Sequence, residues 1–102
     1  MLTQKKYLKS KPVCKAKFLM PKQAIGDAQS VNIVGDFNHW NVNASPMKKL
    51  KNGGFAIALD LPAGKEYQFR YLIDGTKWEN DWAADKYVPS PFGDADNSVI
   101  VV

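Results

Sequence analysis

The sequence has one cysteine, one histidine and no long apolar run, and each scarcity argues against a class of protein. A lone cysteine forms no internal disulfide, and a single histidine beside it argues against a zinc or iron–sulfur site. No segment approaches the roughly 18 apolar residues that cross a membrane, and no apolar signal-peptide region follows the N-terminus. The 102 residues suffice for one domain with its own core. They fall far short of the roughly 250 residues of a (β/α)₈ barrel. We therefore expect a cytoplasmic chain without cofactor or metal, which does not perform chemistry alone.

Acidic residues are missing from the start of the chain. Residues 1–22 hold seven lysines and no acid, whereas the remaining residues hold seven basic and ten acidic side chains. Such a segment can contact nucleic acid or an anionic membrane, or it can be a solvated tail and edge strand guarded by lysine. The segment lacks arginine and has few aromatics, which favours the second interpretation. We predict a basic N-terminal segment at 1–12, before the first clear alternation near Val13, and a domain at 13–102.

Apolar residues alternate with a period of two, and no helical period persists. The alternation predicts strands at 13–20, 31–35, 47–50, 55–61, 66–73, from 77, and at 98–102. We expect loops at 21–29, at 37–46 and around Pro89 and Pro91. About seven short strands in this length indicate an all-β, immunoglobulin-like antiparallel β-sandwich, without the Cys–Trp–Cys pattern of antibody domains. The predicted core includes Phe18, Val31, Ile33, Phe55, Ile57, Leu59, Phe69 and Tyr71.

Three tryptophans stand in polar surroundings: Trp40, Trp78 and Trp82. Each of them could cap an open end of the sandwich, where the indole N–H finds a partner. The inward strand faces already supply five aromatic rings, so caps at all three positions are disfavoured. At least one tryptophan is then expected on the surface, where a large exposed ring suggests a binding role.

The turn after Ile73 decides where Trp78 points. A two-residue loop of Asp74 and Gly75 pairs Tyr71 with Trp78 and puts the indole on the inner face. A three-residue loop that includes Thr76 pairs Leu72 with Trp78, so the indole joins Arg70 and Gln68 on the outer face. The second register also turns Lys77 toward the inner face. The sequence leaves both registers open.

In the second register, a flat ring stands beside a guanidinium and an amide. A sugar offers an apolar C–H face flanked by hydroxyl groups, which suits such a set. Nucleic-acid bases would stack on the same rings. The acidic balance of residues 23–102 argues against nucleic acid.

An ordered set of motifs resembles the isoamylase N-terminal, early-set immunoglobulin-like domains over about residues 13–102. This group includes the family-48 carbohydrate-binding modules, among them the glycogen-binding domain of the AMP-activated protein kinase β subunit. The matching pieces are Val31-Asn32-Ile33-Val34-Gly35-Asp36-Phe37-Asn38-His39-Trp40, Pro46-Met47, Gly54-Phe55 to Leu61-Pro62-Ala63-Gly64, Tyr67 to Asp74-Gly75 with Trp78, Phe92-Gly93 and Asn97-Ser98-Val99.

The resemblance implies a carbohydrate-binding set of five residues. Trp40 and Trp78 would stack on glucose, and Arg70 would bind hydroxyl groups. Phe92 would push against the glucan, and Asn97 would donate to the sugar. The sequence departs from the kinase-type pattern by one extra residue before Trp78, by arginine in place of lysine, and by one extra residue before Asn97. Trp82 has no counterpart in that pattern.

These observations predict a non-catalytic module that binds an α-1,4-glucan oligosaccharide or glycogen, alone or docked to a glycogen-metabolising protein. Membrane and nucleic-acid partners are not expected. The alternative is a structural or protein-interaction domain of the same fold, whose outward aromatics form a protein interface.

An enzyme is the weakest hypothesis. Glu79, Asp81 and Asp85 could be read as paired carboxylates for glycoside hydrolysis, but acids in such a loop are usually solvated or cap turns. Cys14 is expected to be a small buried hydrophobe, and His39 an exposed loop residue.

Overall fold

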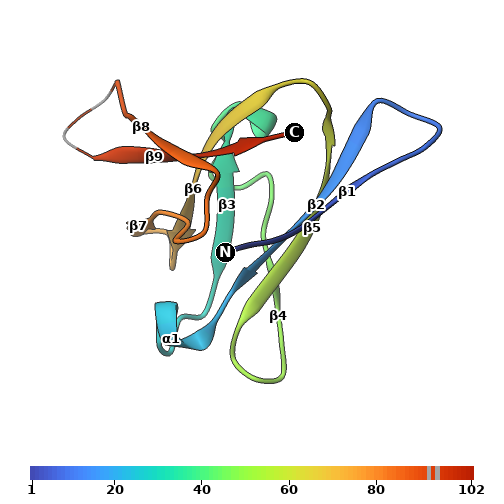
Figure 1. Ribbon diagram of the computed structural model, residues 1–102. Helices are drawn as coiled ribbons and strands as arrows, with labels where there is room; N and C mark the ends of the chain where they lie inside the picture. Colours follow the sequence, from blue (N-terminus) through green and yellow to red (C-terminus); the bar gives the residue numbers. More distant parts are fainter. Residues whose placement is uncertain (92, 94) are drawn as a thin grey trace.

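The computed structural model describes residues 1–91, 93 and 95–102, and it consists of two antiparallel β-sheets packed as a sandwich (Figure 1). The first sheet has the order β1-β2-β5-β4, and the second has the order β3-β6-β9-β8, with β7 also paired to β6. The strands are β1 (Leu2–Tyr7), β2 (Val13–Met20), β3 (Val31–Gly35), β4 (Lys48–Lys49), β5 (Phe55–Pro62), β6 (Glu66–Ile73), β7 (Lys77–Glu79), β8 (Lys86–Pro89) and β9 (Asp96–Val101). Two short helices, α1 (Lys22–Ile25) and a 3₁₀ turn η1 (Asp36–Asn38), flank β3. The predicted all-β sandwich is confirmed, with nine strands in the described residues where about seven were expected.

The core lies between the sheets and follows the predicted alternation. Phe69 of β6 is fully buried, with its ring 5.4 Å from that of Phe18 and 5.9 Å from that of Tyr71. Both contacts are edge-to-face, the arrangement that the ring quadrupoles favour. Ile57 and Leu59, expected in the core, are half-buried and pack against it. The other predicted core residues are buried, as is Cys14: Phe18, Val31, Ile33, Phe55, Phe69 and Tyr71.

The lysine-rich start is an ordered edge strand. Residues of β1 pair with β2 from Leu2 to Tyr7, with an irregularity between Leu2 and Gln4. The side chain of Met1 is buried in the core, and Lys5 forms an ion pair of 2.7 Å with Asp85. The prediction of an edge strand is therefore confirmed. The expectation that regular structure begins only near Val13 is wrong, because this segment pairs with β2 and makes polar contacts with the distant Asp81 and Asp85.

A second strand escaped the sequence analysis near the C-terminus. Residues 86–89 form β8, which pairs with β9 from Lys86↔Val99 to Pro89↔Asp96. Pro89 was expected in a loop because proline donates no ladder hydrogen bond. It is tolerated here because β8 is the edge of its sheet and Pro89 is its last residue. No helix in the described part of the chain is long and apolar enough to cross a membrane.

Strand β6 organises the second sheet because it changes partner along one edge. Its first half, Glu66 to Phe69, pairs with β9, and its second half, Tyr71 to Ile73, pairs with β7. On its other edge it pairs with β3. Arg70 stands at the change of partner, opposite Val34 of β3.

The hairpin between β6 and β7 adopts the three-residue loop. Ile73 is paired with Lys77 and Leu72 with Trp78, and Thr76 N–H donates to the Ile73 carbonyl at 3.1 Å. Trp78 therefore lies on the outer face of the sheet. Lys77, which this register was expected to turn toward the inner face, is exposed.

Candidate functional site

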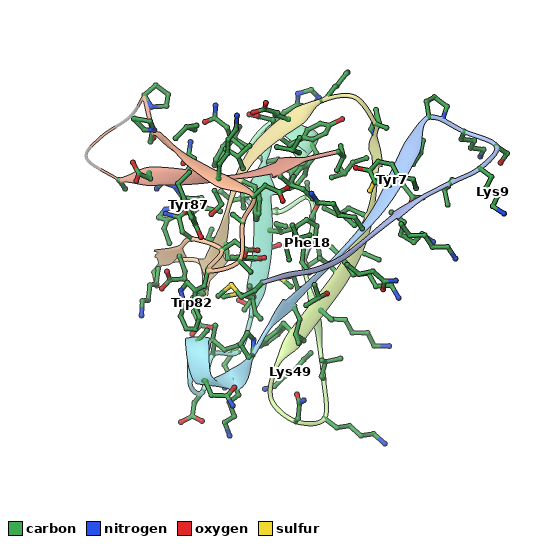
Figure 2. The ribbon with its side chains drawn as sticks, in the orientation of Figure 1. Tyr7, Lys9, Phe18, Lys49, Trp82 and Tyr87 are labelled. Carbon is green, nitrogen blue, oxygen red and sulfur yellow. The ribbon has the colours of Figure 1, made fainter. Side chains whose placement is uncertain are left out.

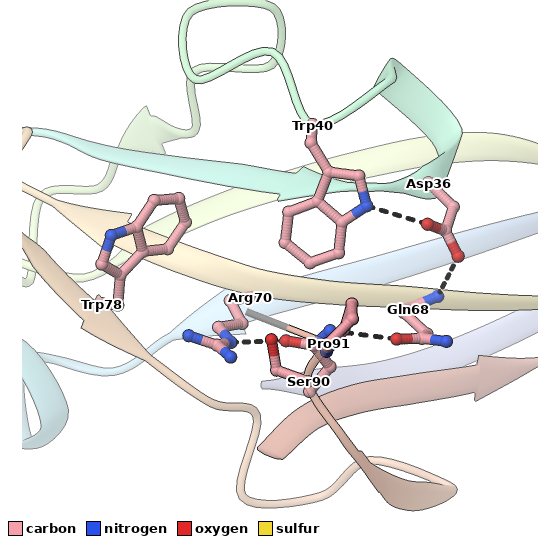
Figure 3. Close-up of a pocket in the computed structure, with 8 residues that line it drawn as sticks. Asp36, Trp40, Gln68, Arg70, Trp78, Ser90 and Pro91 are labelled. Atoms are coloured by element: carbon pink, nitrogen blue, oxygen red, sulfur yellow. Dashed lines mark hydrogen bonds between the residues drawn. The ribbon is translucent and has the colours of Figure 1, made fainter. Parts of the chain in front are cut away.

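The outer face of the second sheet holds a hollow of about 480 Å³ in which the two tryptophans stand on either side of Arg70 (Figure 3). This volume lies within the range of about 300–1,000 Å³ typical of ligand pockets. The hollow collects side chains from η1 and its loop, β6, β7, the segment after β8, and β9. Its lining residues are Asp36, Trp40, Gln68, Arg70, Trp78, Ser90, Pro91 and Asn97.

Three apolar residues are buried on this same face, outside the main core. Val34, Leu72 and Val99 are 0%, 5% and 1% exposed. Val34 pairs with Arg70 and Val99 with Gln68, so all three share the outward side of the pleat. Leu72 was expected to face outward, and it does, but it is covered. These three residues thus form a second, smaller apolar layer on the outer face of the sheet.

Trp40 is held by its loop and by one carboxylate. The loop begins where β3 ends, and the backbone N–H of Trp40 donates to the Gly35 carbonyl at 2.9 Å. The indole Nε1–H donates to Asp36 Oδ1 at 2.8 Å, while Asp36 Oδ2 accepts from the Gln68 backbone N–H at 2.8 Å. The ring is half-buried. Its position is therefore fixed relative to β6, although it stands in a loop.

Arg70 is oriented by a short chain of hydrogen bonds. Its Nε donates to Asn97 Oδ1 at 2.6 Å, and Asn97 Nδ2 donates to Gln68 Oε1 at 2.9 Å. Asn97 is only 3% exposed, so its amide chiefly fixes its two neighbours. Within the described residues, no hydrogen bond uses the terminal Nη groups of Arg70 or the Nε2 of Gln68. These donors are available to a ligand in the hollow.

Trp78 owes its place to the turn before it. Asp74 has a φ of 53° and Gly75 a φ of 69°, and both lie in the left-handed region that tight hairpin turns use. Asp74 Oδ1 also accepts from the backbone N–H groups of Gln29 at 2.7 Å and Ser30 at 3.0 Å. The turn is thereby tied to the segment that enters β3. Trp78 remains 43% exposed.

Four of the five residues expected in the site line this hollow: Trp40, Arg70, Trp78 and Asn97. Phe92 lies outside the described residues. The prediction missed Asp36, Ser90 and Pro91. Asp36 carried a usable signal, since it stands four residues before Trp40 in a tight polar loop.

Trp82 lies away from this site. It is 60% exposed, and its backbone N–H donates to the Met1 sulfur at 3.1 Å. Figure 2 shows it on the same side of the molecule as Tyr87, whose hydroxyl donates to the Asp81 carbonyl. Trp82 is therefore an exposed ring that does not line the hollow.

The carboxylates considered for catalysis are engaged structurally. Asp81 was expected to be solvated or to cap a turn. It does accept from Ala83 N–H at 2.7 Å, but it is fully buried, where Oδ2 also accepts from Tyr71 Oη and Leu2 N–H, both at 2.6 Å. Burial raises the pKa of Tyr71, and the charge and hydrogen bond of Asp81 raise it further. Asp85 is paired with Lys5. Asp81 and Asp85 thus hold β1 against the second sheet, and Glu79 Oε1 accepts from the Asn80 N–H at 3.0 Å. None of the three acids lines the hollow at Arg70.

The hollow offers aromatic rings and hydrogen-bond donors. Among the described residues that line it, the charged groups are one carboxylate, on Asp36, and one guanidinium, on Arg70. Among the described residues, no group of three or more histidine, cysteine or acidic side chains is arranged to hold a metal ion. Two larger hollows, of about 540 and 600 Å³, have no tryptophan or tyrosine in their described lining. The arrangement at Arg70 is suited to binding a flat, polar, uncharged ligand.

Comparison with known families gives one match. The family described as carbohydrate-binding module 48 (isoamylase N-terminal domain) matches residues 26–92, about two thirds of the chain. The matched range contains Trp40, Arg70 and Trp78 and ends before Asn97. A search of curated proteins found no match.

Proposed function

Since the chain belongs to the carbohydrate-binding module 48 family, we propose that it is a non-catalytic module that binds α-1,4-glucans such as glycogen. The observation that carries the proposal is the pair of tryptophan rings on either side of Arg70 in one outer-face hollow. The residues proposed to bind glucan are Trp40, Arg70 and Trp78, with Asn97 behind them. Phe92 is proposed as a fifth binding residue on the resemblance alone.

The chemistry of the hollow supports a neutral sugar polymer. The C–H face of a glucose ring is apolar and stacks on an indole, while its hydroxyl groups accept from Arg70 Nη and Gln68 Nε2. The described residues that line the hollow carry one acid and one base, whose charges cancel. Nucleic-acid binding depends on neutralising several phosphates, so this site does not favour it. An α-1,4-glucan also curves, which lets successive glucose units reach rings on two different elements.

Two further statements belong to the proposal. We infer that the module serves a glycogen-metabolising protein to which it docks, because a binding module without chemistry acts through an enzyme. The second candidate function is a protein-interaction domain. It is favoured by Trp82, Tyr87 and Tyr7, which are 60%, 46% and 55% exposed outside the hollow.

Titration of the protein with β-cyclodextrin and maltoheptaose, followed by calorimetry and tryptophan fluorescence, tests the proposal. We expect saturable binding at submillimolar to millimolar concentration with a change in emission, because ligand contacts two indoles. Cellohexaose, a flat β-1,4-glucan, serves as the matched control and should bind much more weakly. A protein that ignores every α-glucan at millimolar concentration has the interaction function instead.

A further inference from the structure

Backbone strain is concentrated in the two loops that place the tryptophans. Only three non-glycine residues of the described chain have a positive φ: His39 and Trp40, both at 57°, and Asp74 at 53°. The first two are consecutive in the loop of Trp40, and the third begins the turn before Trp78. Such conformations cost about 1–3 kcal/mol each and persist only where neighbouring groups hold them. The Trp40 loop must therefore be held by specific contacts.

Two side chains of η1 divide this task. Asn38 holds the loop backbone: its Oδ1 accepts from Gly35 N–H at 3.0 Å, and its Nδ2 donates to the Ile33 carbonyl at 3.0 Å and to Ser45 Oγ at 3.1 Å. Asp36 instead holds the indole of Trp40 through one oxygen and the backbone of β6 through the other, both at 2.8 Å (Figure 3). The path of the loop and the orientation of the ring thus depend on different residues.

We propose that Asp36 is a positioning residue for glucan binding, which fixes the Trp40 indole against β6 before the ligand arrives. This inference rests on the proposed function and adds to it a residue that touches the tryptophan through its ring nitrogen. A carboxylate suits the role because it presents two acceptor oxygens, one for each N–H. Charge-assisted hydrogen bonds of this kind are stronger than neutral ones.

The effect on affinity comes from order that exists before binding. A ring that is free to rotate loses that freedom when a glucan stacks on it, and immobilising one side chain costs a measurable part of the binding free energy. Asp36 removes this cost in advance. Its loss should weaken glucan binding by roughly three- to tenfold, with the folded structure kept by Asn38.

The test compares three variants for β-cyclodextrin affinity, thermal melting and the indole N–H resonance of Trp40. Asp36→Ala removes both acceptors. Asp36→Asn leaves one acceptor oxygen and should lose less affinity. Asp27→Ala is the matched control, because it removes an exposed acid at the opposite end of β3. We expect unchanged affinity for the control, a roughly three- to tenfold loss for Asp36→Ala, and a shifted Trp40 indole resonance only in the two Asp36 variants. If Asp36→Ala lowers the melting temperature, the isosteric Asp36→Asn carries the comparison.

A double-mutant cycle with Trp40→Phe identifies the path of the effect. Phenylalanine keeps a ring but lacks the N–H, so Asp36→Ala should add no further loss of affinity in that background. Equal, additive losses in both backgrounds would show that Asp36 acts elsewhere and would overturn the inference, as would full affinity in Asp36→Ala. If the unmutated protein binds no α-glucan, the proposed function fails and this role falls with it. If the unmutated protein binds α-glucan and all three variants bind it with the same affinity, only the positioning role is overturned.

Discussion

The eight residues of β6 point alternately to two faces of the sheet, and the two faces differ in what they contact. The inward residues Tyr67, Phe69, Tyr71 and Ile73 are all buried in the core between the sheets. The outward residues Gln68 and Arg70 line the hollow, and Leu72 is buried on the same face. Gln68 Nε2 and Arg70 Nη make no hydrogen bond to another described residue. Because side chains alternate along a strand, each residue of β6 that lines the hollow lies between two core residues in the sequence. The core side and the hollow side of β6 thus use separate sets of side chains.

The largest effect is expected from the inward face. Phe69→Ala removes a fully buried ring that contacts Phe18 and Tyr71, and it should cost about 3–5 kcal/mol of unfolding free energy. Chemical denaturation measures this loss, and β-cyclodextrin affinity per folded molecule should change little. A loss below about 1 kcal/mol would show that Phe69 does not anchor the core.

Gly35 is the position where a single substitution should affect both faces of β6. A Cβ there would lie 2.5 Å from the Gln68 carbonyl oxygen and 2.6 Å from Phe69 Cβ, one residue on each face of β6. Gly35→Ala must therefore push β3 and β6 apart, at a cost of about 1–3 kcal/mol. The same shift should displace Trp40, whose backbone N–H donates to the Gly35 carbonyl. We expect melting temperature and glucan affinity to fall together; a loss of only one would mean that the two faces respond independently here.

The smallest effect is expected from the ion pair that joins β1 to the second sheet. Partial burial acts to raise the pKa of Asp85, but hydrogen bonds from Lys5 and Val101 N–H, with the charge of Lys5, outweigh it and lower the pKa. The stability contributed by the folded-state carboxylate is present above its unfolded pKa of about 3.9 and is lost as pH falls through the lower folded value. Lys5→Ala should cost up to about 1 kcal/mol at neutral pH, with the difference from the unmutated protein shrinking in acid. Melts at pH 7 and below pH 4 measure it. A constant difference across that range would show that the pair contributes by packing alone.

The sequence analysis succeeded where the pattern is local and repeated. The alternation at 66–73 correctly assigned the two faces of β6, and the motif order brought Trp40, Arg70, Trp78 and Asn97 to one surface. The register of Trp78 stayed open because it depends on Asp74, whose carboxylate binds Gln29 and Ser30 more than forty residues earlier.

The features that the sequence analysis missed share a physical cause: each depends on contacts between residues that are not neighbours in the sequence. Strand β1 and the buried Asp81 depend on each other across 79 residues, through Leu2 N–H and Asp81 Oδ2. Neither residue carries a local pattern that marks it as part of the core. Strand β8 was missed because its proline is acceptable only at a sheet edge, and edges are set by tertiary pairing. Asp36 was not named among the expected residues of the hollow because its two contacts, to Trp40 Nε1 and to the Gln68 N–H 32 residues later, join a loop to a strand.

The paired variants Trp78→Ala and Trp82→Ala test the central claim most directly. Both remove an exposed indole, 43% and 60% accessible, but only Trp78 lines the hollow on the outer face of β6. Stacking of an aromatic ring is worth about 0.5–1.5 kcal/mol beyond the area it buries, so Trp78→Ala should weaken β-cyclodextrin binding by roughly tenfold or more. Its melting temperature should hardly change, and Trp82→Ala should bind as the unmutated protein does. Equal affinities for the two variants, or a larger loss in Trp82→Ala, would contradict the assignment of the site.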